Sequence, residues 1–117
     1  MHNDSLSFAG PIRSALAGDP DLAELLPLFV AELPQQVSRL LNLLEQRNLQ
    51  ELRRLVHQIK GAGGGYGFQP ITDLAGAAER RILADEALEA VEEQVQSLIE
   101  LMRRVEGYDH QREKVSG

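Results

Sequence analysis

The chain has 117 residues, the size of one compact domain. It contains no cysteine, which excludes disulfides, thiolate metal sites and thiol catalysis. Its formal net charge of −6 argues against a nucleic-acid partner, because such partners are bound by neutralising their phosphates. The sequence has no apolar run long enough to span a membrane and no secretory signal pattern, so we expect a cytoplasmic protein that does not enter a membrane.

Residues 1–18 are predicted to form an N-terminal arm that carries a short helix. Residues 1–10 are polar and irregular. Residues 11–17 begin with proline and are followed by Gly18. Proline is typical of the first position of a helix and glycine of its end, so this stretch fits a short helix.

The first long helical pattern follows Asp19 and Pro20, a cap residue and a proline that together indicate a helix start. Apolar residues recur from Leu22 to Leu44 at steps of three and four, the spacing of one helical face. Two prolines inside this pattern each remove a backbone donor. We expect either one long helix with a kink near Pro34 or two helices that share a face.

Three more amphipathic helices are predicted after this one. Asn48 and Glu51 have the spacing of a capping box and indicate where the next helix starts. A further helix starts at Pro70, and the last runs from Leu88 to Val105 with its apolar residues on one side.

The predicted fold class is therefore all-α: an antiparallel up-down four-helix bundle over residues 19–107, with the short N-terminal helix added. No segment has the alternating pattern of a strand. Residues 108–117 are charged and poor in apolar side chains, and we predict a disordered tail. A single bundle uses up the apolar faces, so we expect a monomer.

The segment from His57 to Gly67 breaks the rules of an ordinary helix end. Five of the seven residues from 61 to 67 are glycine, and each glycine inside a helix costs about 1 kcal/mol relative to alanine. Even so, the inward apolar spacing continues through the segment. Glycines retained at this cost indicate that another backbone approaches closely.

His57 is predicted to lie on the outer face of its helix, about 150° from the centre of the apolar face at 100° per residue. Arg53 and Arg54 lie one turn before it, and Lys60 follows at i+3 and leans back towards it. Such an exposed imidazole suits phosphoryl uptake, since one ring nitrogen is a nucleophile and nearby cations stabilise the transferred group. The other ring nitrogen needs an acceptor for its proton, and Glu79 is the candidate.

The pattern His57-x-x-Lys60-Gly61, followed by Gly67, resembles the signature of histidine-containing phosphotransfer (HPt) domains. The resemblance implies that His57 accepts the phosphoryl group through Nε2, and that Lys60 is the electrostatic helper. It implies that Gly61 and Gly67 allow close docking and tight helix packing. Many such domains hold the histidine Nδ1 with Gln or Glu 22 residues later, which here is Glu79.

The resemblance also implies partners: receiver domains of response regulators, a hybrid sensor histidine kinase, or both. The phosphoryl group would come from a receiver aspartate and pass to another receiver in a two-component phosphorelay. Mg²⁺ is expected on the receiver, whereas this chain is expected to be a phosphoryl carrier with no metal, cofactor or catalytic machinery of its own.

The expected docking surface combines small and apolar residues with a basic rim. Residues 52–81 carry five basic and two acidic side chains, a net positive island in an acidic chain. The small and apolar part comprises Gly61, Gly64 and Phe68, and the rim comprises Arg53, Arg54, Lys60, Arg80 and Arg81.

Two alternatives remain at this stage. The chain resembles the phosphoacceptor domain of chemotaxis-type kinases as well, where a Glu supports the histidine and a separate kinase domain supplies the phosphoryl group from ATP. It could instead be a non-catalytic helical interaction module with an incidental histidine. A nucleotide-binding glycine loop is excluded, because no strand precedes the glycines and their spacing fits neither phosphate-loop motif.

Overall fold

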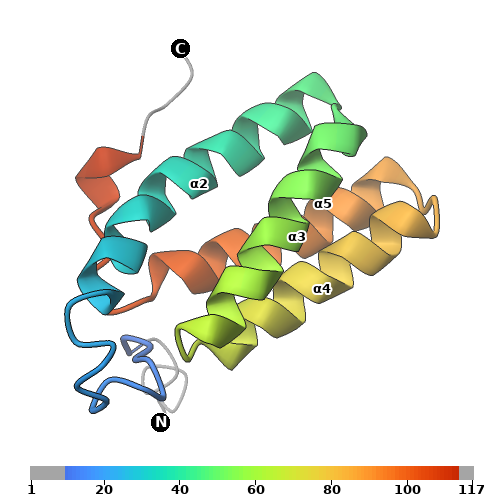
Figure 1. Cartoon of the computed structure of the whole chain (residues 1–117). Helices are drawn as coiled ribbons and strands as arrows, with labels where there is room; N and C mark the ends of the chain where they lie inside the picture. The colour runs from blue at the N-terminus through green and yellow to red at the C-terminus, as the bar shows by residue number, and fades with distance from the viewer. Residues whose placement is uncertain (1–9, 114–117) are drawn as a thin grey trace, which may run out of the picture.

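The computed structural model describes residues 10–113, and within this range the chain forms four α-helices and one short 3₁₀-helix (Figure 1). The elements are α2 (Leu26–Gln46), α3 (Leu49–Gly65), α4 (Gln69–Leu83), α5 (Leu88–Arg103) and η1 (His110–Arg112). Consecutive α-helices run antiparallel through short connections, and α5 also packs against α2. The predicted all-α four-helix bundle is confirmed. Residues 1–9 and 114–117, parts of the predicted arm and tail, lie outside the described residues.

One apolar core runs through the bundle, and all four helices contribute to it. Each large side chain buried there contributes roughly 1.5–3 kcal/mol relative to an exposed one. The largest fully buried side chains are Leu33, Val37 and Leu40 of α2, Leu52, Val56 and Ile59 of α3, Ile71 of α4, and Val91, Val95, Leu98, Ile99 and Met102 of α5.

The first long pattern forms one helix, α2, with Pro34 inside it and buried. The helix begins later than Pro20 suggested, because residues 20–25 form turns. Pro27 lies in the first turn, where its missing N–H would have no helical acceptor in any case. The Ser38 hydroxyl donates to the carbonyl oxygen of Pro34 at 3.1 Å.

The starts of α3 and α4 follow the local signals. The Asn48 side chain accepts a hydrogen bond from the backbone N–H of Glu51 at 3.2 Å, which satisfies a helix-terminal donor and confirms the predicted cap. Pro70 lies in the first turn of α4. Helix α3 continues through the glycines to Gly65, so the inward spacing did mark a helix.

The predicted short helix at residues 11–17 is wrong. This segment is a strap that crosses one end of the bundle, where Ile12 pairs with the chain beyond α5. The Ile12 N–H donates to the carbonyl of Arg104 and its carbonyl accepts from the N–H of Glu106, both at 2.8 Å. A helix of about two turns is costly to nucleate, whereas these backbone groups find partners across the bundle end.

The predicted disorder is wrong for residues 108–113, and the folded unit extends past Gly107. Tyr108 is 8% exposed, and its hydroxyl donates to the Glu113 carboxylate. Arg103 of α5 also binds Glu113, through Nε at 2.8 Å and Nη2 at 2.7 Å. Tyr108 and the ion pair of Arg103 with Glu113 anchor this charged segment. Its composition alone had predicted a disordered tail.

Candidate functional site

His57 lies midway along α3, and its side chain is 62% exposed. Its neighbours Val56 and Ile59 are buried in the core, so the helical phase turns the imidazole away from it. This is the outer-face position expected from the 100° step between residues.

Glu79 of α4 reaches across to the imidazole. Its Oε2 atom lies 2.8 Å from His57 Nδ1. Because an ionised carboxylate only accepts hydrogen bonds, Nδ1 carries the proton and donates it. In the neutral ring the lone pair then resides on Nε2, for which no partner exists among residues 10–113. The geometry thus presents an oriented imidazole with one free nucleophilic nitrogen.

Lys60 binds the other oxygen of the same carboxylate, with Nζ 2.7 Å from Glu79 Oε1. Its ammonium is therefore held by Glu79, and it reaches His57 only through that carboxylate. The Glu79 side chain is 11% exposed. The hydrogen bond from Lys60 lowers the pKa of the Glu79 carboxyl, burial opposes this, and the His57 contact lowers it further. Glu79 is consequently ionised at neutral pH, and its carboxylate binds both His57 and Lys60.

Two residues of α4 that sequence reasoning missed also contact Lys60. The Thr72 hydroxyl donates to the Lys60 carbonyl at 2.6 Å. Gly76 is buried, and a Cβ placed on it would lie 3.3 Å from Lys60 Cδ. Their spacing from Glu79, at i, i+4 and i+7, was the available signal, since it places all three on one helical face.

The glycines of α3 differ in what surrounds them. Gly61 is exposed with open space where a side chain would stand, and Gly64 is exposed with only the Thr72 hydroxyl nearby. Gly63 is buried, and a Cβ there would press on Ile71 at 3.0 Å. Gly61 and Gly64 therefore leave surface beside His57 uncovered, while Gly63 lets α4 pack closely.

A comparison with protein families identifies the chain. The model of the Hpt domain matches residues 24–108, which include all four α-helices of the bundle. This chain belongs to the Hpt domain family. No match was found among curated proteins or among solved structures.

Gly67 of this HPt domain lies under the strap. Its φ is +85°, a left-handed conformation, and its carbonyl accepts from the N–H of Ala15 at 2.8 Å. A Cβ at Gly67 would collide with Ser14 Oγ and approach the Leu16 backbone nitrogen at 2.9 Å. The position therefore serves the packing of the strap and is not open for docking.

The expectation that Phe68 contributes to an exposed docking surface is wrong. Phe68 is 3% exposed, and its ring stacks on Phe29 of α2 at a centroid distance of 5.6 Å. It is the residue before α4, where the chain turns back towards the core. Phe68 lies next to the glycines in sequence, but this position does not predict that its ring points into the core.

In the predicted basic rim, Arg53, Arg54 and Arg80 differ from Arg81 in what they contact. Arg53 is half-buried and Arg80 exposed, and neither forms an ion pair within residues 10–113; Arg54 pairs with Glu51 at 3.2 Å. Arg81 does not belong with them. Its guanidinium donates to the carbonyl of Ala90 at 2.8 Å, so it fastens the α4–α5 corner instead of facing a partner.

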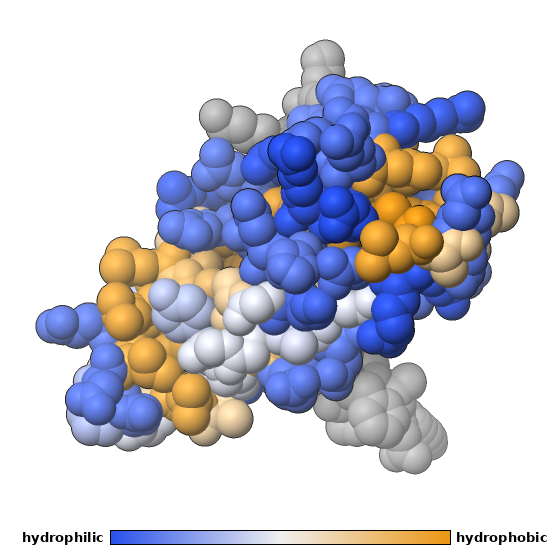
Figure 2. Space-filling view, turned by 45° about the vertical axis from the view of Figure 1, so that its right-hand side comes forward, coloured by the Kyte–Doolittle hydropathy of each residue, from blue (hydrophilic) through white to orange (hydrophobic). Residues whose placement is uncertain are grey.

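Apolar and pale areas interrupt the hydrophilic surface of the HPt domain (Figure 2). The large apolar side chains exposed among the described residues are Leu16, Leu25, Leu28 and Leu83. Leu16 belongs to the strap, Leu25 to the turns before α2 and Leu28 to the first turn of α2. These segments lie at the bundle end where α3 ends with its glycines.

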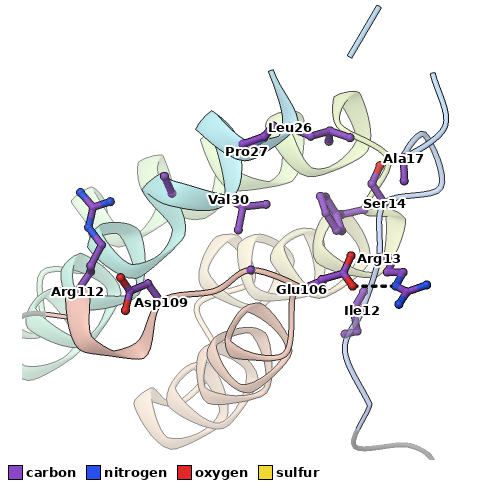
Figure 3. Close-up of a pocket in the computed structure, with 13 residues that line it drawn as sticks. Ile12, Arg13, Ser14, Ala17, Leu26, Pro27, Val30, Glu106, Asp109 and Arg112 are labelled. Atoms are coloured by element: carbon purple, nitrogen blue, oxygen red, sulfur yellow. Dashed lines mark hydrogen bonds and ion pairs between the residues drawn. The ribbon is translucent and has the colours of Figure 1, made fainter. Parts of the chain in front are cut away.

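A cavity of about 430 Å³ lies between the strap, α2 and the segment after α5 (Figure 3). Ile12, Leu26, Val30 and Phe68 line it, and the ion pair of Arg13 with Glu106, at 3.0 Å, forms one wall. None of its lining residues belongs to the His57 site.

Two further features concern only the part of the chain that the structure describes. No helix there is long and apolar enough to cross a membrane. No three His, Cys, Asp or Glu side chains gather there into a group suited to a metal ion.

Proposed function

We propose that this HPt domain carries phosphoryl groups between receiver domains, with His57 as the acceptor. The observation that carries the proposal is the contact between His57 Nδ1 and Glu79, which engages Nδ1 and leaves Nε2 as the unengaged nitrogen of an exposed side chain. The Nε2 lone pair attacks the phosphorus of a receiver aspartyl phosphate. The bond between phosphorus and the aspartate oxygen breaks, and its electron pair leaves with the carboxylate. Reversal onto a second receiver completes the relay.

Glu79 supports this step electrostatically. The ring retains its Nδ1 proton when Nε2 attacks, so positive charge develops on the imidazole. The Glu79 carboxylate lies 2.8 Å away and is largely buried, where a fixed opposite charge acts more strongly than in water. The carboxylate therefore stabilises the charged ring while it fixes the tautomer that reacts.

The receiver is proposed to dock on the face of α3 that carries His57. Arg53, His57, Gly61 and Gly64 follow each other at steps of three and four, so they share that face. The two glycines admit the partner's backbone, and Arg53, together with Arg80 of α4, favours an anionic phosphorylated aspartate. The receiver supplies its own Mg²⁺. We propose that the domain acts as a cytoplasmic monomer in a two-component system.

The test is transfer of labelled phosphoryl groups from receiver domains that have been phosphorylated beforehand. We expect acid-labile, base-stable label on the wild-type domain and none on His57→Gln. Label that appears only when a histidine kinase and ATP are present would assign His57 to direct phosphorylation by a kinase. Absence of label under both conditions would overturn the proposal and leave an interaction module.

A further inference from the structure

Three successive positions on one face of α4 contact three different parts of Lys60. The Thr72 hydroxyl holds its backbone carbonyl at 2.6 Å. The Glu79 carboxylate holds its ammonium at 2.7 Å. Gly76 lies between these two, and its position faces the methylene chain of Lys60. The lysine is therefore held by the neighbouring helix at its backbone carbonyl and at its ammonium, and its methylene chain passes over Gly76 between them.

Gly76 contributes space to this arrangement. A Cβ there would lie 3.3 Å from Lys60 Cδ, closer than ordinary packing, and 3.4 Å from Arg80 Nη1. Its backbone does not require glycine, because the glycines with positive φ among the described residues are Gly67 and Gly107. A glycine in the middle of a helix costs about 1 kcal/mol relative to alanine. What glycine supplies at this position is the space beside the Lys60 side chain.

We infer that Gly76 is a positioning residue for phosphotransfer: its missing side chain lets Lys60 lie flat across α4 and reach Glu79, and so sets where the ammonium stands relative to the phosphoryl group on His57. The inference rests on the proposed function for its kinetic consequence. The structural half, that Gly76 controls the contact between Lys60 and Glu79, does not depend on it.

The structural half is tested by NMR titration of the Glu79 carboxyl carbon in wild type, Gly76→Ala and Gly76→Leu. The hydrogen bond from Lys60 is the largest cause of the lowered pKa of Glu79. We expect this pKa to move up towards the ordinary value in Gly76→Ala, and further in Gly76→Leu. Gly65→Ala is the matched control, because it also replaces a helical glycine but has open space around it. An unchanged Glu79 titration in both Gly76 variants would overturn the inference.

The kinetic half is tested by a double-mutant cycle with single-turnover transfer from a phosphorylated receiver. Gly76→Ala is expected to slow transfer by about threefold or more in the wild-type background and to have no effect in the Lys60→Ala background. At the same time its thermal midpoint should change little, because the helix preference of alanine over glycine offsets the weakened contact between Lys60 and Glu79. Equal slowing in both backgrounds would contradict action through Lys60. Complete absence of phosphorylation in the wild type would overturn the proposed function, and the Glu79 titration would still decide on Gly76.

Discussion

Glu79 accepts a hydrogen bond from His57 Nδ1 at 2.8 Å across the contact between α3 and α4. The two residues are 22 positions apart in sequence and belong to antiparallel helices joined by a tight turn. The pair converts an exposed histidine into an oriented one. Most of the behaviour expected of this HPt domain follows from that contact.

Replacing the proposed phosphoryl acceptor, His57, should remove activity and leave stability nearly unchanged. His57→Gln is expected to abolish phosphoryl uptake, because the amide offers no nucleophilic ring nitrogen. The side chain is 62% exposed, so the free energy of unfolding should change by less than about 0.5 kcal/mol. Transfer assays and urea unfolding of the same preparation check both halves. A large loss of stability would contradict the outward position of His57.

Substitutions of Glu79 should differ in a graded way. Glu79→Gln keeps an oxygen that can accept from Nδ1 but loses the charge, so transfer should slow while the fold stays intact. Glu79→Ala also leaves Lys60 without its partner and should lower the free energy of unfolding by about 1–3 kcal/mol. Single-turnover rates and urea midpoints distinguish the two. Equal transfer rates for Gln and wild type would show that the charge on Glu79 has no part in the step.

Stability should fall in acid because two carboxylates are held ionised. Hydrogen bonds from Lys60 lower the pKa of Glu79, and hydrogen bonds from Arg103 lower the pKa of Glu113. A carboxyl whose pKa is lowered by folding stabilises the fold above its ordinary value of about 4.3, and this contribution is lost as the pH falls through the lower folded-state value.

Urea unfolding at a series of pH values between 3 and 7 measures this effect. Glu113→Gln should be less stable than the wild type at pH 7 and should lose less stability on acidification. The two stability curves should therefore converge at low pH. Parallel curves over the whole range would mean that Glu113 does not contribute through its charge.

Two glycines of the same segment should respond in opposite ways to alanine. Gly67 has a φ of +85° and is covered by Ser14, so Gly67→Ala should destabilise the domain, by more than about 1 kcal/mol. Gly61 has open space in a helix, so Gly61→Ala should raise stability by up to about 1 kcal/mol. The same change should weaken docking, because it adds a side chain beside His57.

Thermal unfolding and the receiver-concentration dependence of transfer measure these two effects. Gly65→Ala, one turn further from His57 along α3, is the control for helix stabilisation. Unchanged dependence on receiver concentration in Gly61→Ala would remove Gly61 from that face.

The sequence by itself determined the features that depend on local chain geometry. Helical periodicity defined the bundle, the Asn48 cap marked the start of α3, and the 100° step turned His57 outward. These are properties of one helix at a time, so residue spacing is enough to predict them. The contact between Glu79 and His57 could also be predicted from the sequence, because a short turn between antiparallel helices fixes which positions face each other.

Only the tertiary structure decided the features that depend on contacts between distant segments. Ile12 bonds to residues 104–106, so the proline and glycine signals predicted a helix that does not form. Glu113 is held by Arg103, so composition wrongly predicted disorder just after Gly107. The direction of Phe68 and the contact of Gly76 with Lys60 depend on how α4 packs against its neighbours. Packing of this kind is a property of helix pairs. The spacing along α4 puts Gly76 on the same face as Glu79, but it does not say which atoms of α3 lie against that face.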